Sequence, residues 1–353
     1  MFPEGFARTE RTFALRSAVV TSGLVTASAG LVVGTYPTPV ERLDALSRPK
    51  SALWVKRDDL THPLYGGNKV RKLEHLLAEA SRRGKTRVLT LGAAGSHHVL
   101  ATSIFGARAG LGVDAVLVPQ RNTGHVVENL RADLAAGATL FPVSAYATVP
   151  FGLLRAYRRT SYVIPMGGSN VVGSLGYVDA ARELAAQVKA GLLPEPDVAV
   201  VTLGSGGTVA GLAAGLALAG LRTRIIAVVV AGPAFVTVAM ARWLASRCYA
   251  RAGGHDRSLV RDRIVPTAKY LGRGYGEPTE AGARATEEAK DVGLVLDPTY
   301  TAKCFAAALD VVRSDAYANV LYWHTLSSAP MEPLLAGAPA GDAIDPRLRR
   351  LLR

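Results

Sequence analysis

The sequence predicts an α/β protein of two domains, built on open, twisted, mainly parallel sheets. Its 353 residues are 49% hydrophobic and 20% charged, which excludes a disordered chain. This length suits roughly two domains, or one large doubly wound sheet. From about residue 50, short β-branched runs alternate with amphipathic helical patterns, as is typical of βαβ units. Such sheets bind ligands at the carboxyl ends of their strands, where this chain has glycine-rich turns.

The predicted elements follow one another in regular alternation. Apolar residues recur at i, i+3, i+4 and i+7 from Leu73, which predicts a helix with Asn68 as its N-cap and Gly84 at its exit. The later elements are expected as strand 87–91, helix 96–108, strand 113–118, helix 126–136, strand 139–143, strand 198–203, helix 208–218, strand 224–230 and strand 320–323.

The charge of the chain does not predict a nucleic-acid partner. The formal net charge is +13, but the basic residues are scattered and no aromatic-interleaved basic stripe occurs. The densest basic cluster is Arg347, Arg349, Arg350 and Arg353, which is interpreted as a solvated tail. The alternatives are a diffuse positive field that attracts anionic small molecules, or no function of the charge at all.

The chain is also expected to lie in the cytoplasm and not in a membrane. No uninterrupted apolar run reaches the ~20 residues of a membrane-spanning helix. Arg11 and Arg16 precede a mildly apolar stretch at 18–30, which is interpreted as a leader-like extension and not as a secretory signal. Cys248 and Cys304 cannot form a disulfide framework, and this fits a reducing compartment.

One turn brings three cations to the start of a helix. Lys69, Arg71 and Lys72 follow Gly66 and Gly67 within the first helical turn, where the helix dipole is already positive. This arrangement is tolerable if an anion binds nearby, or if one lysine is held neutral as a nucleophile. The alternative is that the long side chains reach into solvent, and the pattern alone does not decide between them.

A second turn has the composition of a phosphate site. The segment 202–208 follows a strand and opens a helix, and successive N–H groups of such a turn can cradle a phosphate. The turn has neither the Lys-Ser/Thr pair of a nucleotide-binding P-loop nor the spacing of a dinucleotide fingerprint. It is therefore expected to hold a single phosphate.

A third turn, at 92–98, again links a strand to a helix. Ser96 is a candidate N-cap of that helix, and His97 and His98 point to different sides of it. Adjacent histidines of this kind do not form a metal-binding face, and no other grouping has the spacing of metal ligands. No metal site is expected.

Together these turns resemble a known family. The segments 53–60 (LWVKRDDL) and 66–74 (GGNKVRKLE) are similar to the D-cysteine desulfhydrase and 1-aminocyclopropane-1-carboxylate deaminase family. Its members are pyridoxal-phosphate (PLP) enzymes of the tryptophan-synthase-β fold type, fold type II. The resemblance spans about 31–325 and includes the segments 36–39, 165–169, 204–208, 274–276 and 296–301.

The resemblance implies a domain division and a set of site residues. The larger domain would comprise 1–71 and 176–353, with 1–30 as an extension and 331–353 as a tail, and the smaller domain would be 72–175. The implied catalytic residues are Lys69, which would carry PLP, Ser96, Tyr275 and Tyr300. The implied cofactor-binding residues are Lys69, Asn68, Lys72, His97, Gly204, Ser205, Gly206, Gly207, Thr208, Thr301 and Thr325. The implied substrate-binding residues are Ser96, His97, His98, Tyr275 and Tyr300.

Three positions distinguish the chain within the family. Thr301 takes the position beside the pyridine nitrogen where the cyclopropane deaminase has a glutamate, and a hydroxyl there suits β-elimination. His97 replaces an asparagine that bonds the cofactor's phenolic oxygen, which would couple the site to pH near neutrality. Leu326 and Ser327 replace two glycines.

The resemblance implies a cytoplasmic, homodimeric PLP-dependent lyase or deaminase. The expected reaction is β-elimination from a D-cysteine-like amino acid, which gives a keto acid and ammonia. The alternatives are other PLP chemistry on the same fold, namely ring-opening deamination, racemisation or β-replacement. A non-catalytic relative that binds PLP or an amino acid is a further alternative.

Overall fold

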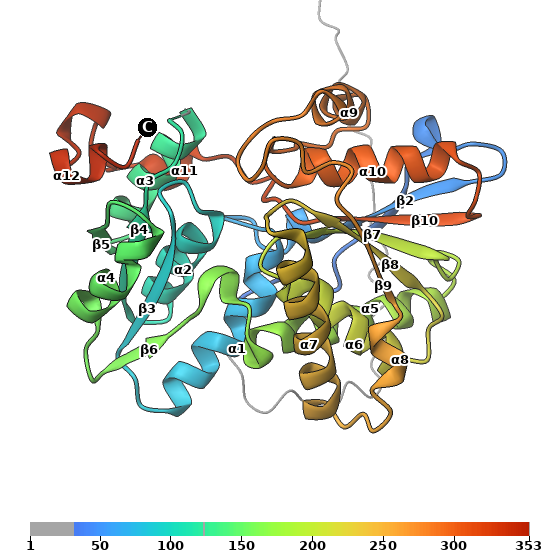
Figure 1. Cartoon of the computed structure of the whole chain (residues 1–353), viewed down its shortest axis with the longest axis horizontal. Helices are drawn as coiled ribbons and strands as arrows, with labels where there is room; N and C mark the ends of the chain where they lie inside the picture. The colour runs from blue at the N-terminus through green and yellow to red at the C-terminus, as the bar shows by residue number, and fades with distance from the viewer. Residues whose placement is uncertain (1–31, 123, 353) are drawn as a thin grey trace, which may run out of the picture. The chain divides into compact units, whose positions relative to one another are not determined.

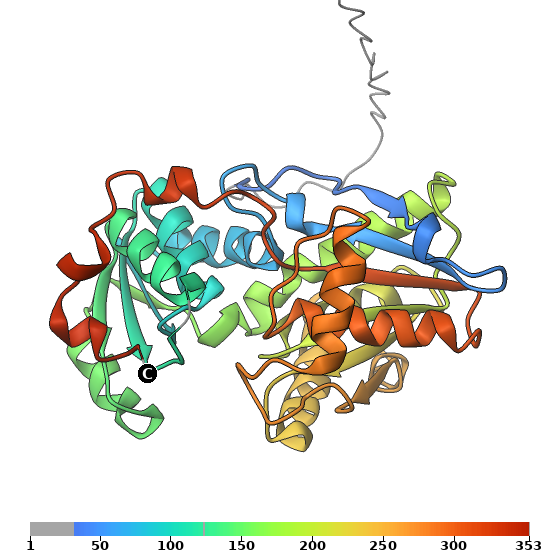
Figure 2. The same cartoon turned by 90° about the horizontal axis from the view of Figure 1, so that it is seen from above.

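Two separate sheets organise the chain in the computed structural model, which describes residues 32–122 and 124–352 (Figures 1 and 2). The larger sheet has the strand order β1-β2-β10-β7-β8-β9, and only its edge pair β1–β2 is antiparallel. The smaller sheet has the order β5-β4-β3-β6 and is wholly parallel. This confirms the predicted α/β class with mainly parallel sheets. The predicted extension at 1–30 lies outside the described residues.

Six strands lie close to their predicted ranges, and four more, at 40–42, 52–57, 161–163 and 264–267, were not predicted. In the larger sheet they are β1 (Val40–Arg42), β2 (Ala52–Arg57), β7 (Val198–Leu203), β8 (Arg224–Val229), β9 (Ile264–Thr267) and β10 (Asn319–His324). In the smaller sheet they are β3 (Arg87–Ala93), β4 (Gly112–Val118), β5 (Thr139–Pro142) and β6 (Ser161–Val163).

Helices cover both faces of the larger sheet. The helices that lie over or beside its two faces are α5 (Val171–Lys189), α6 (Gly207–Leu218), α7 (Ala234–Arg251), α8 (Ser258–Arg261), α9 (Glu280–Lys290) and α10 (Thr301–Arg313). Helix α1 (Asn68–Arg82) packs on α5 and buries its apolar side chains with those of α2 and β3 of the smaller sheet. Helices α5, α6 and α7 lie below the sheet in Figure 1, and α9 and α10 lie above it. The smaller sheet carries α2 (His97–Arg108), α3 (Gly124–Ala135) and α4 (Val149–Ala156).

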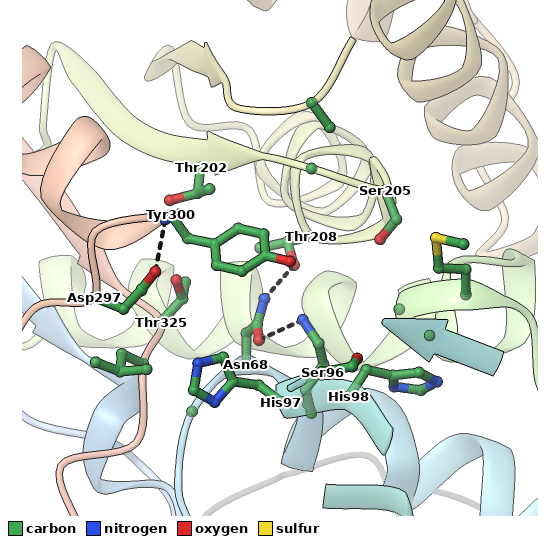
Figure 3. A pocket seen from close by; sticks show the side chains of 18 of the residues that line it. Asn68, Ser96, His97, His98, Thr202, Ser205, Thr208, Asp297, Tyr300 and Thr325 are labelled. Carbon is green, nitrogen blue, oxygen red and sulfur yellow. Dashed lines mark hydrogen bonds between the residues drawn. The ribbon is translucent and has the colours of Figure 1, made fainter. Parts of the chain in front are cut away.

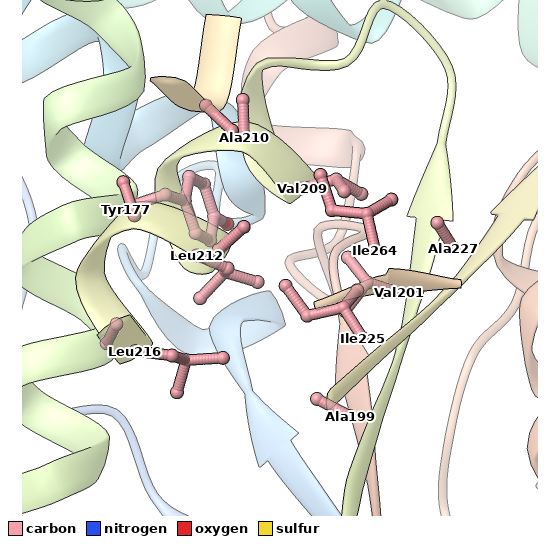
Figure 4. Close-up of a cluster of buried hydrophobic side chains, with 14 of the residues drawn as sticks. Tyr177, Ala199, Val201, Val209, Ala210, Leu212, Leu216, Ile225, Ala227 and Ile264 are labelled. Carbon is pink, nitrogen blue, oxygen red and sulfur yellow. The ribbon is translucent and has the colours of Figure 1, made fainter. Parts of the chain in front are cut away.

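Strand β7 shows why the larger sheet needs a layer of helices on each face. Its residues Ala199, Val201 and Leu203 are buried among α5, α6 and α7, in the cluster of Figure 4. The alternate residues Val198 and Val200 are buried in a second cluster with side chains of α10. Because successive side chains of a strand point to opposite faces, a strand that is apolar throughout needs a helical layer on each face.

The C-terminal segment differs from the expectation of a tail in the larger domain. After β10 the chain crosses to the smaller sheet, where α11 (Glu332–Leu335) packs near α3 and α12 (Pro346–Arg349) follows. Ile344, Leu348 and Leu351 are buried there among residues of β4, α2 and α3. The spacing of these apolar residues puts them on one side of the segment, and the arginines between them stay exposed. The tail interpretation is therefore wrong for this segment, although its arginines are solvated.

Within the described part of the chain, none of the helices combines the length and apolarity that a membrane crossing requires. Cys248 and Cys304 are both buried free thiols.

Candidate active site

A cavity of about 480 Å³ lies where the glycine-rich turns of both sheets meet. The turns after β3 and β7, the start of α1 and the start of α10 all contribute to its walls, as Figure 3 shows. Every site residue that the resemblance implies lines this cavity except Gly207, whose N–H donates to the hydroxyl of Ser169. Residues that lie more than 200 positions apart in the sequence thus form one site.

The first helix starts one residue earlier than the sequence suggests. Gly67 is its N-cap with φ of 90°, and Asn68 is the first helical residue, so the assignment of Asn68 as cap is wrong. A Cβ at Gly67 would lie 2.7 Å from the carbonyl oxygen of Thr325, because the backbones of the two segments touch there. The side chain of Asn68 is consequently free to act in the cavity.

The amine of Lys69 lies in the cavity and takes part in a short chain of hydrogen bonds. Its Nζ donates to Asn68 Oδ1 at 2.9 Å, and Asn68 Nδ2 donates to Thr208 Oγ1 at 3.1 Å. Burial lowers the pKa of Lys69 to about 8, while the negative charge of Asp297 acts in the opposite direction. A sizeable fraction of this amine is therefore neutral, as a nucleophile or a base requires.

The other two cations of this turn are also buried, so the interpretation that they reach into solvent is wrong. Arg71 turns into the core, where its guanidinium pairs with Asp58 at 2.8 Å and with Glu183 at 2.9 Å. Lys72 donates to the carbonyl oxygen of Gly167 at 3.1 Å. Burial, with the nearby charge of Lys69, lowers the pKa of Lys72 well below its usual value. A bound anion would restore the charged form of Lys72.

Hydrogen-bond donors gather around Lys72 at the start of α6 and form what we call the α6 cup, namely Lys72, Ser169, Ser205, Gly207 and Thr208. Ser169 Oγ lies 3.2 Å from Lys72 Nζ and 2.7 Å from Ser205 Oγ, and it accepts from Gly207 N at 3.1 Å. A Cβ at Gly207 would lie 2.6 Å from Ser169 Oγ and 2.9 Å from Lys72 Nζ. Hydroxyls, an ammonium and a helix N-terminus together make an anion site.

Ser169 was not among the expected site residues. The segment 165–169 belongs to the resemblance, but nothing in its own pattern indicates that its serine contacts Ser205, which lies 36 residues further on.

Two tyrosines face each other across one side of the cavity. The hydroxyls of Tyr275 and Tyr300 are hydrogen-bonded, and their ring centroids lie 5.8 Å apart at 72°. Burial raises the pKa of Tyr275 to about 12 and raises that of Tyr300 well above its usual value. Both phenols therefore keep their protons at neutral pH and can donate them.

Asp297 is a second residue that the sequence reasoning missed. Its carboxylate accepts from the N–H groups of Thr299, Tyr300 and Thr301 at 2.9, 2.7 and 3.1 Å, and it lines the cavity. The hydroxyl of Thr301 donates to Asp297 Oδ2 at 2.7 Å and accepts from Asp297 N at 2.7 Å. An aspartate shortly before a helix is a capping signal, and that signal could have identified it.

His97 and His98 turn to different sides, as expected. His98 Nε2 lies 3.0 Å from Thr90 Oγ1 of β3, whereas His97 Nδ1 lies 2.7 Å from the hydroxyl of Tyr65. Burial, and then the neighbouring His125, lower the pKa of His97 to about 3. The imidazole is neutral throughout the neutral range, so the expected titration of His97 near neutrality is wrong.

Ser96 is the N-cap of α2, and its hydroxyl also lines the cavity. Its Oγ accepts from Val99 N at 3.4 Å, which is a long bond and leaves the hydroxyl available to a ligand.

The comparison with known protein families identifies the family of the chain and its cofactor. The family described as "Pyridoxal-phosphate dependent enzyme" matches residues 32–325, which is most of the chain. The chain belongs to this family. Its cofactor is therefore pyridoxal phosphate.

Individual relatives place the chain more narrowly. It is 37% identical over 306 residues to "Nocardicin C-9' epimerase" of Nocardia uniformis subsp. tsuyamanensis, covering 83% of this chain and 91% of the relative. It is 34% identical over 333 residues to "D-cysteine desulfhydrase" of Klebsiella pneumoniae, covering 88% and 95%. It is 34% identical over 302 residues to "Putative 1-aminocyclopropane-1-carboxylate deaminase" of Thermotoga maritima, covering 82% and 93%.

Solved structures agree with the sequence comparison. An ACC deaminase homologue superposes with a TM-score of 0.74 at 29% identity, covering 86% of this chain and 94% of that one. The processed form of threonine deaminase isoform 2 from Solanum lycopersicum, 17% identical with a TM-score of 0.60, shares the fold. The chain is thus a PLP-dependent enzyme of the D-cysteine desulfhydrase and ACC deaminase family, with the expected fold type.

The chemistry of the cavity fits pyridoxal phosphate. The cofactor needs an amine for its aldehyde and donors for its phosphate. The cavity offers a partly neutral lysine amine at Lys69 and the donor-rich α6 cup. Among the described residues, no cluster of three or more histidine, cysteine or carboxylate side chains could hold a metal ion.

Proposed function

We propose that the chain is a PLP-dependent lyase that eliminates the β-substituent of a small, D-cysteine-like amino acid to give a keto acid and ammonia. The observation that carries the proposal is one cavity that holds a lysine amine with a pKa of about 8 and two protonated phenols. β-Elimination needs both a base for the α-proton and an acid for the leaving group.

In this proposal, each wall of the cavity holds one part of the cofactor. Lys69 would bind it covalently and the α6 cup would hold its phosphate. Thr301, Asn68, His97 and Thr325 would surround its ring. Bound PLP supplies an electron sink that acidifies the Cα–H bond of an amino acid attached to it.

Lys69 would act as the base. With a pKa of about 8, roughly a tenth of its free amine is neutral at pH 7. That amine can take the α-proton and return a proton later in the reaction. Ser96, at the start of α2, would hold the substrate carboxylate with its hydroxyl.

The tyrosine pair would supply the acid. Because Tyr275 and Tyr300 share a hydrogen bond and both retain their protons, one phenol can donate to a departing sulfur while the other stabilises the charge left behind. Forming a phenolate without a hydrogen-bond donor in a buried site is unfavourable. The hydrogen bond from the second tyrosine stabilises the phenolate of the first.

The test is product analysis with purified protein and PLP. D-Cysteine should yield pyruvate, ammonia and sulfide in equal amounts, and L-cysteine and 1-aminocyclopropane-1-carboxylate should react poorly. Lys69→Ala serves as the control and should retain the fold without turnover. Efficient ring opening of the cyclopropane substrate would contradict the proposal, as would full activity of Lys69→Ala.

Epimerisation is the second candidate, and two observations favour it. A relative with 37% identity is named an epimerase. Tyr146 and Met166, which line the cavity, are 57% and 40% exposed, so the cavity reaches solvent beside them and a longer substrate side chain could extend there. In deuterated water an epimerase would exchange the α-hydrogen and invert the amino acid without releasing keto acid, whereas a lyase would release keto acid. Racemisation, β-replacement and simple binding of PLP are distinguished by the same product analysis.

We further propose a cytoplasmic homodimer. Two buried free thiols are consistent with a reducing compartment. Phe235, Met240 and Trp243 of α7 are 77%, 54% and 57% exposed, an apolar face that a second copy could cover. Light scattering on the eluted protein gives its mass, and a monomer would contradict the proposal.

A further inference from the structure

Tyr65 is a buried tyrosine in the wall of the cavity. The residue is 3% exposed, directly precedes the turn that carries Lys69, and lines the cavity. Its hydroxyl lies 2.7 Å from His97 Nδ1, which is the hydrogen-bond partner that the described residues offer it. A buried phenol must place its proton on an acceptor, because an unsatisfied buried hydroxyl is unfavourable.

This contact settles the direction of the hydrogen bond. If His97 Nδ1 carried a proton and donated it, the phenol proton of Tyr65 would have no acceptor among the described residues. If Tyr65 donates, both groups are satisfied. A neutral imidazole carries one proton, so donation into Nδ1 puts the ring proton on Nε2.

The surroundings of His97 keep the ring neutral. The ring of His125 from α3 lies 4.5 Å away, centroid to centroid, and the amine of Lys69 from α1 also disfavours a positive imidazole. Asp297, before α10, has the opposite effect, but burial outweighs it and the pKa of His97 falls to about 3. The ring centroid of Tyr300 lies 6.5 Å from that of His97.

The other ring nitrogen is left for a ligand. Within residues 32–122 and 124–352, His97 Nε2 has no hydrogen-bond partner, and His97 lines the cavity. We propose that Tyr65 is a positioning residue that holds His97 in the neutral Nε2–H tautomer, so that this N–H is a permanent donor to the anionic ring oxygen of bound PLP. The part that concerns PLP rests on the proposed orientation of the cofactor, whereas the tautomer does not.

The tautomer is tested by nitrogen NMR of histidine-labelled full-length protein after removal of the cofactor. Wild type should show His97 with unprotonated Nδ1 and protonated Nε2, unchanged between pH 5 and pH 8. Tyr65→Phe should give a mixture of both tautomers. Protonated Nδ1 in wild type, or the same single tautomer in Tyr65→Phe, would overturn the proposal.

The consequence for the cofactor is tested by PLP affinity and the pH dependence of PLP absorbance. Tyr65→Phe should raise the PLP dissociation constant by about tenfold, equivalent to about one lost hydrogen bond of ~1.4 kcal/mol. Tyr157→Phe is the control, since Tyr157 is 52% exposed and does not line the cavity, and it should leave the affinity unchanged. His97→Asn should retain PLP, and adding Tyr65→Phe to it should cause no further loss, because the two residues act through one hydrogen bond.

The outcomes separate the positioning role from the catalytic proposal. Additive effects of Tyr65→Phe and His97→Asn would overturn the positioning role, even if the enzyme proves to be a lyase. Absence of lyase activity together with a single Nε2–H tautomer would overturn the proposed reaction and leave the role of Tyr65 intact.

Discussion

At the scale of single residues, burial determines what each site group can do. The same cavity lowers the pKa of Lys69 to about 8, lowers that of His97 to about 3, and raises that of Tyr275 to about 12. An amine thereby becomes available as a base, an imidazole becomes a fixed neutral group, and a phenol keeps its proton. Each residue acquires its role because burial disfavours charged forms.

The pKa of Lys69 leads to a prediction for the pH dependence of the rate. A base must be neutral to act, so the rate should rise nearly tenfold per pH unit below about pH 8 and level off above it. Steady-state rates between pH 6 and pH 10 would measure this. Because the charge of Asp297 raises the pKa of Lys69, Asp297→Asn should move the profile to lower pH. A rise centred near pH 10.5 would mean that Lys69 is not held in the observed environment.

The α6 cup leads to a second prediction at this scale. Gly207→Ala would push a methyl group against Ser169 Oγ and Lys72 Nζ, which lie 2.6 and 2.9 Å from its position. We expect PLP affinity to fall by about tenfold or more, with little loss of stability, because Lys72 is flexible at its end. PLP titration followed by fluorescence measures the first effect.

A second glycine of the same helix provides the contrast. At Gly215 a Cβ would meet Ala181 Cβ at 2.6 Å in the core, away from the cup. Gly215→Ala should therefore destabilise the protein and leave PLP affinity unaltered. Equal affinities of wild type and Gly207→Ala would remove Gly207 from the cup.

At the scale of elements, buried hydrogen bonds and ion pairs anchor α1, and the anchored helix holds Lys69 in place. Asp58, between β2 and the turn before α1, accepts from Arg71 at 2.8 Å and from Tyr177 of α5 and Trp323 of β10 at 2.8 Å each. Glu183 of α5 pairs with Arg71 as well. The network ties α1 and α5 to β10 and to the segment that follows β2, two residues along α1 from Lys69.

Removing the central cation should therefore be severe. Arg71→Met would leave Asp58 and Glu183 buried without their partner, at a cost of roughly 3–5 kcal/mol. Urea unfolding measures this loss. Arg82→Met, on the same helix, is the control, because Arg82 is 73% exposed in its pair with Glu79 and its loss should cost under about 1 kcal/mol. Similar effects of both substitutions would show that the buried network does not anchor α1.

The helices also show why the sequence predicts some elements better than others. Helix α1 has a clear apolar period and was predicted, whereas α5 was not. Gly176 interrupts the pattern of α5, because a Cβ there would lie 2.0 Å from the carbonyl oxygen of Arg71. Helix α6 lies close to its predicted range, although it is buried and apolar on every side and shows no apolar period. Close packing thus removes the periodicity on which sequence reasoning depends.

At the scale of the whole molecule, turns from two sheets form one cavity, and this explains what the sequence could indicate about the site. Glycine-rich turns after strands are visible in the sequence, and they did line the cavity. Tyr65 and Ser169 have no such local signal, since each acts on a partner brought near only by folding, whereas Asp297 has the local signal of a helix cap. The family resemblance indicated the cofactor, and the local pattern of the turns did not.

The cavity also depends on the C-terminal segment, at the far end of the chain. Leu351 O accepts from Gln120 N at 2.9 Å, and Gln120 Oε1 accepts from Gly95 N at 2.9 Å. Gly95 directly precedes Ser96 in the turn that lines the cavity. A segment that follows the last strand by more than 20 residues therefore supports one wall of the site.

The last prediction follows from this packing. Leu348→Ala would remove a side chain that is 5% exposed among residues of β4, α2 and α3, and such truncations cost about 2–5 kcal/mol. Arg349→Ala, one residue further along and exposed, is the control and should change stability by less than about 0.5 kcal/mol. Hydrogen exchange should then become faster in α3 and β4 of Leu348→Ala, while β7 and α6 keep their protection. A solvated tail would instead leave stability and exchange unchanged in both variants. Exchange in the turn at 92–96 should also rise, because the hydrogen bonds through Gln120 connect this turn to the C-terminal segment.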